Sequence, residues 1–276
     1  MNAKTARFTL SLSLAAALLL APFAAEAKPP KKPRSKQPQQ QPSQQPSQAQ
    51  GEPARAEQAP PPGLDGVDER LWHYQTGAAR DALGKYMDQA DGNAYVAMAY
   101  GRVLDQEKKY GDAEARLRKA TEMAPNDPAP FVYLGELYLR QGRNGDDAFR
   151  KAAEVARAKG GSEAAYYLGV AQQRLKQYDE AIATLQGARA PAPALIPYQI
   201  GVTRAFQENW PAAVEQLNRA VEMDSGLAYA YYYRGLAQDK LGRKDQLVGD
   251  MERFLALAPN APEADRAKAI IRSVKH

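Results

Sequence analysis

The sequence predicts an all-α fold in which about five helix–turn–helix repeats stack into a solenoid. The first observation is a series of glycines spaced by 34, 34, 32 and 34 residues, at Gly101, Gly135, Gly169, Gly201 and Gly235. The second is that small and apolar residues follow most of these glycines at fixed distances. The third is that prolines close several units, at Pro125, Pro193 and Pro259. A period of roughly 20 to 50 residues is typical of repeat architectures.

Each recurring residue type has a packing role. The glycine allows two helices to approach closely, and the small residue twelve positions later has the same role on the second helix. An apolar residue four positions further and another three beyond it lie on one helical face. These positions hold Ala113, Leu117 and Ala120; Ala181, Leu185 and Ala188; and Ala213, Leu217 and Ala220. The last unit has Leu247, Met251 and Phe254, and it departs from the pattern at Leu247, where the small residue is expected. Proline cannot continue a helix interior, so it ends the second helix.

The clearest unit, 94–127, also contains Tyr100-Gly101 and Lys109-Tyr110. With these residues the pattern resembles the tetratricopeptide repeat (TPR) family over about two thirds of the chain. The resemblance implies a right-handed superhelical TPR solenoid. The expected bounds are 63–93 for degenerate opening helices, 94–127, 128–161, 162–193, 194–227 and 228–261 for the repeats, and 262–276 for a C-terminal capping helix. Because Asn144-Gly145-Asp146-Asp147 falls where the second helix of 128–161 should begin, we expect that helix to be shortened or shifted.

The N-terminus reads as a secretory signal peptide over residues 1–27. Lys4 and Arg7 precede an apolar run over 8–21, and Ala25-Glu26-Ala27 forms an A-x-A cleavage site. The run is shorter than the ~20 residues that span a bilayer. We therefore expect cleavage after Ala27 and an exported bacterial protein, periplasmic or otherwise extracytoplasmic. An uncleaved N-terminal anchor is the alternative.

Residues 28–62 are rich in Pro, Gln, Ser and Lys and have almost no large apolar side chains, so a disordered linker is expected. The linker has a net charge of +4 and the signal peptide +1, which leaves no net charge on 63–276. The high pI of the chain is thus no sign of a nucleic-acid-binding fold, and no nucleic acid partner is expected. The basic cluster 28–36 either makes weak contact with anionic lipid or cell wall, or is a solvated start of the linker.

The composition argues against most enzyme chemistry. The chain has no Cys and two His, His73 and His276, so it offers no thiol, disulfide, Cys-ligated zinc or multi-His metal site. No phosphate-binding, dinucleotide-binding or hydrolase motif occurs. The acidic pair Asp146-Asp147 is explained as a turn or helix start. We expect a non-enzymatic protein with no cofactor and no metal.

The TPR resemblance implies a concave groove lined by fixed positions of each first helix. Carried onto this chain, the candidate groove residues are Tyr95, Met98, Arg102, Val132, Tyr166, Val170, Tyr198, Val202, Tyr229, Tyr232 and Leu236. Such a groove suits an extended peptide or an amphipathic helix of a protein partner. Tyr166, Tyr198 and Tyr232 occupy the same position of successive repeats and form either a binding ladder or packing between repeats. The expected function is a protein-binding adaptor in assembly of an envelope or secretion complex; the alternative is a structural spacer tethered to wall or membrane by the basic linker.

Overall fold

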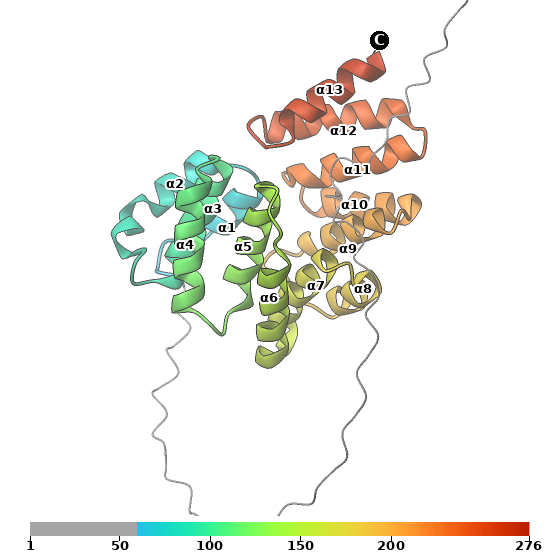
Figure 1. The fold of residues 1–276 in the computed structure, drawn as a ribbon. Helices are drawn as coiled ribbons and strands as arrows, with labels where there is room; N and C mark the ends of the chain where they lie inside the picture. The colour runs from blue at the N-terminus through green and yellow to red at the C-terminus, as the bar shows by residue number, and fades with distance from the viewer. Residues whose placement is uncertain (1–59, 276) are drawn as a thin grey trace, which may run out of the picture. The chain divides into compact units, whose positions relative to one another are not determined.

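A computed structural model describes residues 60–275, which are helical and contain no strand (Figure 1). The predicted signal peptide, and the predicted linker up to residue 59, lie outside the described residues. The elements are α1 (Val67–Trp72), α2 (Thr76–Leu83), the 3-10 helix η1 (Gly84–Gln89), α3 (Ala94–Gln106), α4 (Tyr110–Met123), α5 (Pro128–Arg140), α6 (Asp146–Lys159), α7 (Gly161–Arg174), α8 (Tyr178–Gln186), α9 (Leu195–Phe206), α10 (Trp210–Met223), α11 (Ala228–Lys240), α12 (Lys244–Leu257) and α13 (Ala264–Lys275).

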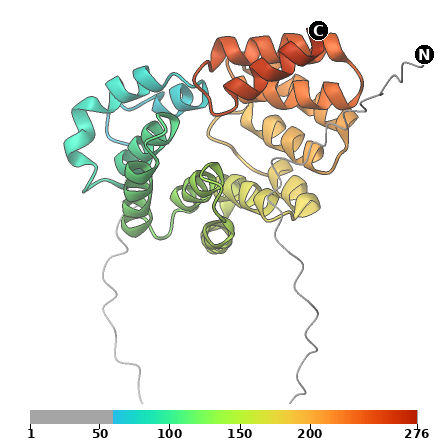
Figure 2. The same ribbon diagram turned by 45° about the horizontal axis from the view of Figure 1, so that its top comes forward.

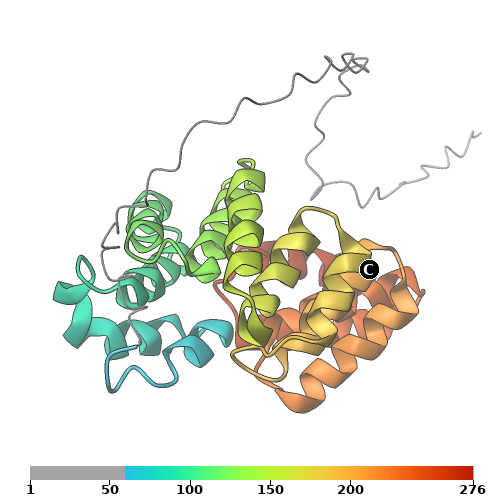
Figure 3. The same cartoon turned by 90° about the horizontal axis from the view of Figure 1, so that it is seen from below.

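Helices α3 to α12 form five successive antiparallel pairs, one in each predicted repeat. Figure 2 and Figure 3 show the same succession of hairpins from α3 and α4 to α11 and α12. In each pair the turn contains one residue with left-handed backbone, φ between 59° and 76°, at Lys108, Gly142, Lys176, Glu208 and Gly242. The amide after it donates to the carbonyl five residues earlier, as in Lys109 N to Leu104 O at 2.9 Å. This C-cap ends every first helix in the same way.

The recurring glycines lie where the two helices of a pair touch. A Cβ added to Gly101, Gly169 or Gly201 would stand 2.6–2.8 Å from Cγ of the leucine sixteen residues later. Real Cβ atoms do not approach that closely, so the pair can close only around glycine. The leucines themselves, Leu117, Leu185 and Leu217, are at most 1% exposed. The predicted reason for the glycine period is confirmed.

The second helix of the irregular repeat is shifted, not shortened. Helix α6 has 14 residues, as α4 does, but it begins two residues later in its repeat. Asn144 Oδ1 accepts from the amide of Asp146 at 2.7 Å and holds the delayed start. The helix that is short is α8, with 9 residues.

The two ends of the repeat array are covered by different elements. The opening segment 63–93 folds into three short helices, α1, α2 and η1. Buried residues of α1 and α2 pack against Val96, Ala99 and Val103 of α3. At the other end, α13 buries Ala264 and Ala267 and packs the flanks of Ile270 and Ile271 on α12 and its neighbours. Its outer face is polar, which a terminal repeat needs for solubility. Within residues 60–275 no helix is long and apolar enough to cross a membrane.

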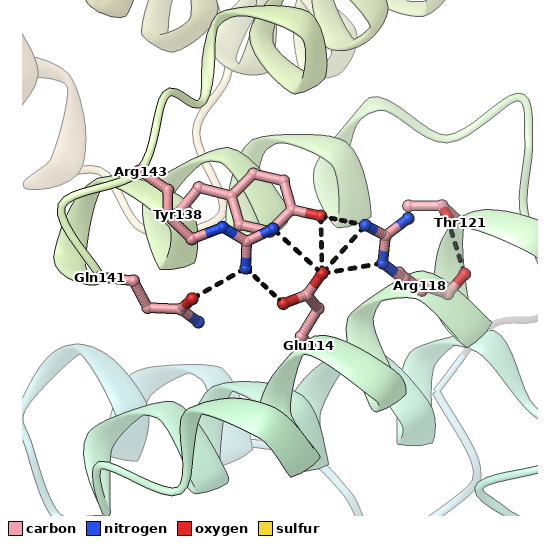
Figure 4. Close-up of polar contacts among 6 residues, drawn as sticks. All are labelled: Glu114, Arg118, Thr121, Tyr138, Gln141 and Arg143. Carbon is pink, nitrogen blue, oxygen red and sulfur yellow. Dashed lines mark hydrogen bonds and ion pairs between the residues drawn. The ribbon is translucent and has the colours of Figure 1, made fainter.

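A polar cluster ties α4 to α5 and the turn after it (Figure 4). Glu114 accepts from Arg143 Nη1 at 2.6 Å, from Arg118 Nε at 3.0 Å and from the Tyr138 hydroxyl at 3.0 Å. The guanidinium of Arg143 also lies 4.1 Å from the centre of the Tyr138 ring. The Arg143 hydrogen bond, with those from Arg118 and Tyr138, lowers the pKa of Glu114 to about 2. The cluster is therefore a charged staple between the first and second repeats.

Candidate interaction wall

The first helices of successive repeats, α3, α5, α7, α9 and α11, contact one another in order and form one continuous surface, here called the first-helix wall. Polar pairs join neighbouring first helices along it. Asp105 of α3 pairs with Arg140 of α5. Glu136 of α5 pairs with Arg174 of α7, Nε to Oε1 at 2.6 Å. These pairs fix the register of one repeat on the next.

The eleven predicted groove residues all lie on helices of this wall, but most are covered by their neighbours. Seven are buried, with side chains inside the apolar clusters between repeats or, for Arg102, in an ion pair: Met98, Arg102, Val132, Tyr166, Val170, Val202 and Tyr232. Four are half-buried: Tyr95, Tyr198, Tyr229 and Leu236. Packing between repeats is thus what the structure shows for six of these residues, whereas Arg102 pairs with Asp68 of the opening segment. A role of any of the eleven in binding a partner stays a prediction.

The tyrosines at equivalent positions contact one another through a neighbour. Tyr233 has its ring centre 6.3 Å from Tyr198 and 5.5 Å from Tyr232, and Tyr232 in turn lies 5.0 Å from Phe254. Tyr166 instead stacks edge-on against Tyr167. The Tyr232 hydroxyl is buried and has no hydrogen-bond partner among residues 60–275, and burial raises its pKa to about 12. The aromatic cluster is therefore centred on α11.

Two side chains on the wall that are not among the eleven candidate residues are exposed. Leu139 of α5 and Phe206 of α9 are each 38% exposed. Arg174, on the helix between them, pairs with Glu136 and lies 5.8 Å from the Phe206 ring centre. Glu136 and Leu139 are three residues apart and share a face of α5. Leu139 and Phe206 are thus two exposed apolar side chains joined by the largely covered pair Glu136–Arg174. These four residues, on three first helices, are here called the exposed strip.

A signal for this strip was present in the sequence. Phe206 occupies the last turn of its first helix, where the equivalent residues are Gln106, Arg140, Arg174 and Lys240. An aromatic residue at a position where the other repeats have polar residues indicates an exposed apolar side chain that is available for contact.

The N-terminal end of the wall is covered by the chain itself. Asp68 of α1 forms an ion pair with Arg102 and accepts from the Tyr95 hydroxyl at 3.2 Å. The Arg102 guanidinium lies between the rings of Trp72 and Tyr133, 5.7 Å and 4.2 Å from their centres. Burial, followed by the Asp68 charge, raises the pKa of Tyr95. The predicted positions Tyr95 and Arg102 are therefore occupied by α1, which repeat periodicity does not foresee.

The described residues contain no group of three or more His, Asp or Glu placed to hold a metal ion. His73 is paired with Asp224, Nε2 to Oδ2 at 2.7 Å. Asp146 and Asp147 lie in the first turn of α6, where acidic side chains favour the helix dipole. These three residues thus have structural roles.

No protein-family model matches the chain, and no curated protein matches it. Among solved structures, the chain is similar to TTC0263, a TPR protein of Thermus thermophilus, with a TM-score of 0.52 and 18% identity over 66% of this chain and 98% of that one. It is also similar to a chain of the APC/C hetero-tetramer Cut9–Hcn1, with a TM-score of 0.50 and 15% identity. That match covers 77% of this chain but 42% of the other, so the chain spans less than half of its length. At these identities the likeness concerns the fold, and the described part of this chain is a solenoid of the tetratricopeptide-repeat fold.

Proposed function

We propose that the chain is a non-enzymatic adaptor that binds an extended peptide or an amphipathic helix of a partner protein on its first-helix wall. One observation carries the proposal. The described residues leave three large apolar side chains exposed, Leu139, Phe206 and Met223, and two of them stand on the wall. An amphipathic helix presents apolar side chains along one face and buries them against accessible apolar side chains of its partner.

The chemistry of the exposed strip supports a protein partner. Phe206 lies 6.1 Å from the Tyr178 ring and 6.4 Å from the Tyr233 ring, so it is held in place by other aromatic side chains. Arg174 adds a guanidinium beside it. Aromatic residues and arginine are enriched at the centres of protein interfaces, because they bury much area and retain directional contacts. The similar solved structure Cut9–Hcn1 is itself a complex of two proteins.

The cellular site belongs to the same proposal. The A-x-A site after an apolar run supports export to the bacterial envelope, where the adaptor would assist assembly of an envelope or secretion complex. The competing function is a structural spacer. Its residues 28–36 would contact the cell wall or a membrane, and the linker would keep the repeat array at a distance from that surface. Deletion of 28–62 separates the two. An adaptor without its linker still binds its partner in solution, whereas a spacer loses its localisation and has no partner to retain.

The partner-binding proposal is tested by photo-crosslinking from the wall. A benzophenone amino acid replaces Phe206 in one variant, Leu139 in a second and Met223 in a third, and each protein is irradiated in cells. Met223 is the matched control, because it is the third exposed apolar residue and lies on α10, a second helix. We expect one discrete adduct from positions 139 and 206 and none from 223. Equal labelling from all three positions would contradict the proposal.

A further inference from the structure

The turn after α1 reaches the last repeat of the array. The Tyr74 and Tyr229 rings have their centres 5.3 Å apart, and the Tyr74 hydroxyl donates to the Tyr229 hydroxyl at 3.1 Å. His73 Nε2 and Asp224 Oδ2 are 2.7 Å apart. Residues 73–75, here called the tip, therefore join the opening segment to the end of the fourth repeat and to the fifth, about 150 positions later in the sequence.

The contact continues beyond Tyr229. The Tyr229 hydroxyl donates to Glu263, immediately before α13, so one hydrogen-bonded chain runs from the tip to the C-terminal cap. Burial is the main cause that raises the pKa of Tyr74 to about 12. A hollow of about 230 Å³ lies beside the tip, lined by residues 74–78, Gln106 and residues 258–260. Both ends of the described chain are thus needed to form it.

The backbone conformation at Tyr74 indicates that the tyrosine side chain has a role at this position. Tyr74 has φ +56°, a left-handed conformation that is unfavourable for a bulky residue and that glycine or asparagine adopts readily. The turn after α1 needs only the conformation, not the ring. The ring and the hydroxyl of Tyr74 both contact Tyr229. We therefore attribute the presence of a tyrosine at this position to that contact.

The opening segment packs in two places. Leu64, Val67 and Leu71 are at most 1% exposed and pack with α2 and α3. His73 instead pairs with Asp224, and Tyr74 contacts Tyr229 and packs against the apolar cluster of the fifth repeat. Release of the tip would break these contacts and leave the core formed with α2 and α3 intact.

We propose that the tip is a latch that holds the opening segment against the fifth repeat, and that a partner gains access to the α11 end of the first-helix wall only when the latch opens. Tyr229 lies under Tyr74 in the closed form, so a ligand that contacts Tyr229 must displace it. A stack of repeats in which each contacts mainly its neighbours flexes readily, so a contact between distant repeats has a large effect on its opening. The gating role rests on the proposed function, whereas the latch itself does not.

The latch is tested without any partner, by a distance measurement across it. Because the chain contains no Cys, Asp81→Cys on α2 and Gln246→Cys on α12 give a unique pair of spin labels at two exposed positions. Pulsed electron–electron double resonance then reports the distance distribution between the first and last parts of the array. We expect one narrow distribution for this labelled parent.

Two variants open the latch from opposite sides. Tyr74→Gly removes the ring and hydroxyl and relieves the left-handed backbone, so the turn after α1 still forms. Gly226→Ala adds a Cβ that would stand 3.1 Å from two atoms of the His73 ring, and it leaves α1 untouched. Tyr74→Gly should shift the distribution to longer distances and broaden it. Gly226→Ala needs the His73 ring to move by only a few tenths of an ångström, so it should broaden the distribution less.

Lys108→Gly is the matched control, because Lys108 has the same left-handed backbone at φ +63° in the turn after α3, where the residue belongs to no latch contact. It should leave the distribution unchanged, and circular dichroism should show the same helix content in all variants. A distribution that is the same for Tyr74→Gly, Gly226→Ala and the parent would overturn the latch. Failure of the photo-crosslinking test with a positive result here would overturn the binding proposal alone.

Discussion

The ring of Phe149 on α6 lies directly over Gly135 on α5. A Cβ at Gly135 would stand 2.7 Å from two carbons of that ring, whereas in the other four repeats the glycine faces a leucine or methionine sixteen residues later. Phe149 comes only fourteen residues after its glycine. Phe149 is larger than the leucine or methionine of the other repeats and comes two positions earlier after its glycine. It therefore fills the space beside Gly135 that the delayed start of α6 would otherwise leave empty.

This relationship predicts the effect of Gly135→Ala on stability. The added Cβ overlaps a rigid ring that is 1% exposed, so the variant should lose about 1–3 kcal/mol of unfolding free energy. Gly111→Ala on α4 is the control, because its Cβ would meet nothing within 4 Å. That change should be neutral or stabilise by up to about 1 kcal/mol. Chemical denaturation of both variants measures the difference, and equal midpoints would contradict the close contact.

The staple around Glu114 predicts a pH dependence of stability. The pKa of Glu114 is about 2 in the folded protein and 4.5 ordinarily. Because the folded pKa is the lower one, the stabilisation is complete above pH 4.5 and is lost as the pH falls toward 2. Glu114→Gln should lower the melting temperature at pH 7 and reduce its fall between pH 4.5 and 2. A parent and variant whose melting temperatures differ by the same amount at all pH values would exclude this role.

Removal of the Tyr229 hydroxyl should lower the stability of the protein, whereas removal of the Tyr232 hydroxyl should not. The Tyr229 hydroxyl bonds to Tyr74 and Glu263, so Tyr229→Phe should cost about 1–2 kcal/mol. The buried Tyr232 hydroxyl has no hydrogen-bond partner in the described part of the chain, so Tyr232→Phe should be neutral or stabilising. Thermal melts of the two variants, which differ only in which oxygen is lost, decide the point. A larger loss in Tyr232→Phe would show that its hydroxyl is bonded in solution.

The ion pair Glu136–Arg174 should contribute more than an exposed pair of the same type. Its side chains are 17% and 21% exposed, so Glu136→Gln leaves a largely covered guanidinium without its charge partner and should cost about 1–3 kcal/mol. Glu163, paired with Arg189 at 3.7 Å, is 74% exposed. Glu163→Gln should therefore change stability by less than about 0.5 kcal/mol. Urea denaturation of both variants compares them, and similar costs would argue against burial as the cause.

The repeat array could be predicted from the sequence because its packing depends on local spacing. Gly101, Gly169 and Gly201 each lie against a leucine of their own repeat, so the contact leaves a fixed separation in the chain. The shift of α6 was also visible, in Asn144 and the early Phe149. The short α8 was not, since its end is set at Gly187, after which the Arg189 amide bonds to Ser162 O at the start of α7.

The site was less predictable, for a physical reason. Position within a repeat indicates which side of a helix a residue occupies, and all eleven candidates lie on the expected helices. It does not indicate what covers them. The contact of Tyr74 with Tyr229 joins residues 155 positions apart, outside any repeat period. The repeat period of the sequence therefore does not predict such a contact.

The central claim is that the exposed strip of the first-helix wall binds a partner protein. The most direct measurement is calorimetric titration of the partner identified by crosslinking against two variants of the full-length chain, Leu139→Ser with Phe206→Ser, and Met223→Ser. We predict at least a tenfold loss of affinity for the double variant, about 1.4 kcal/mol, and parent affinity for Met223→Ser. Parent affinity in the double variant, with helix content unchanged, would contradict the claim.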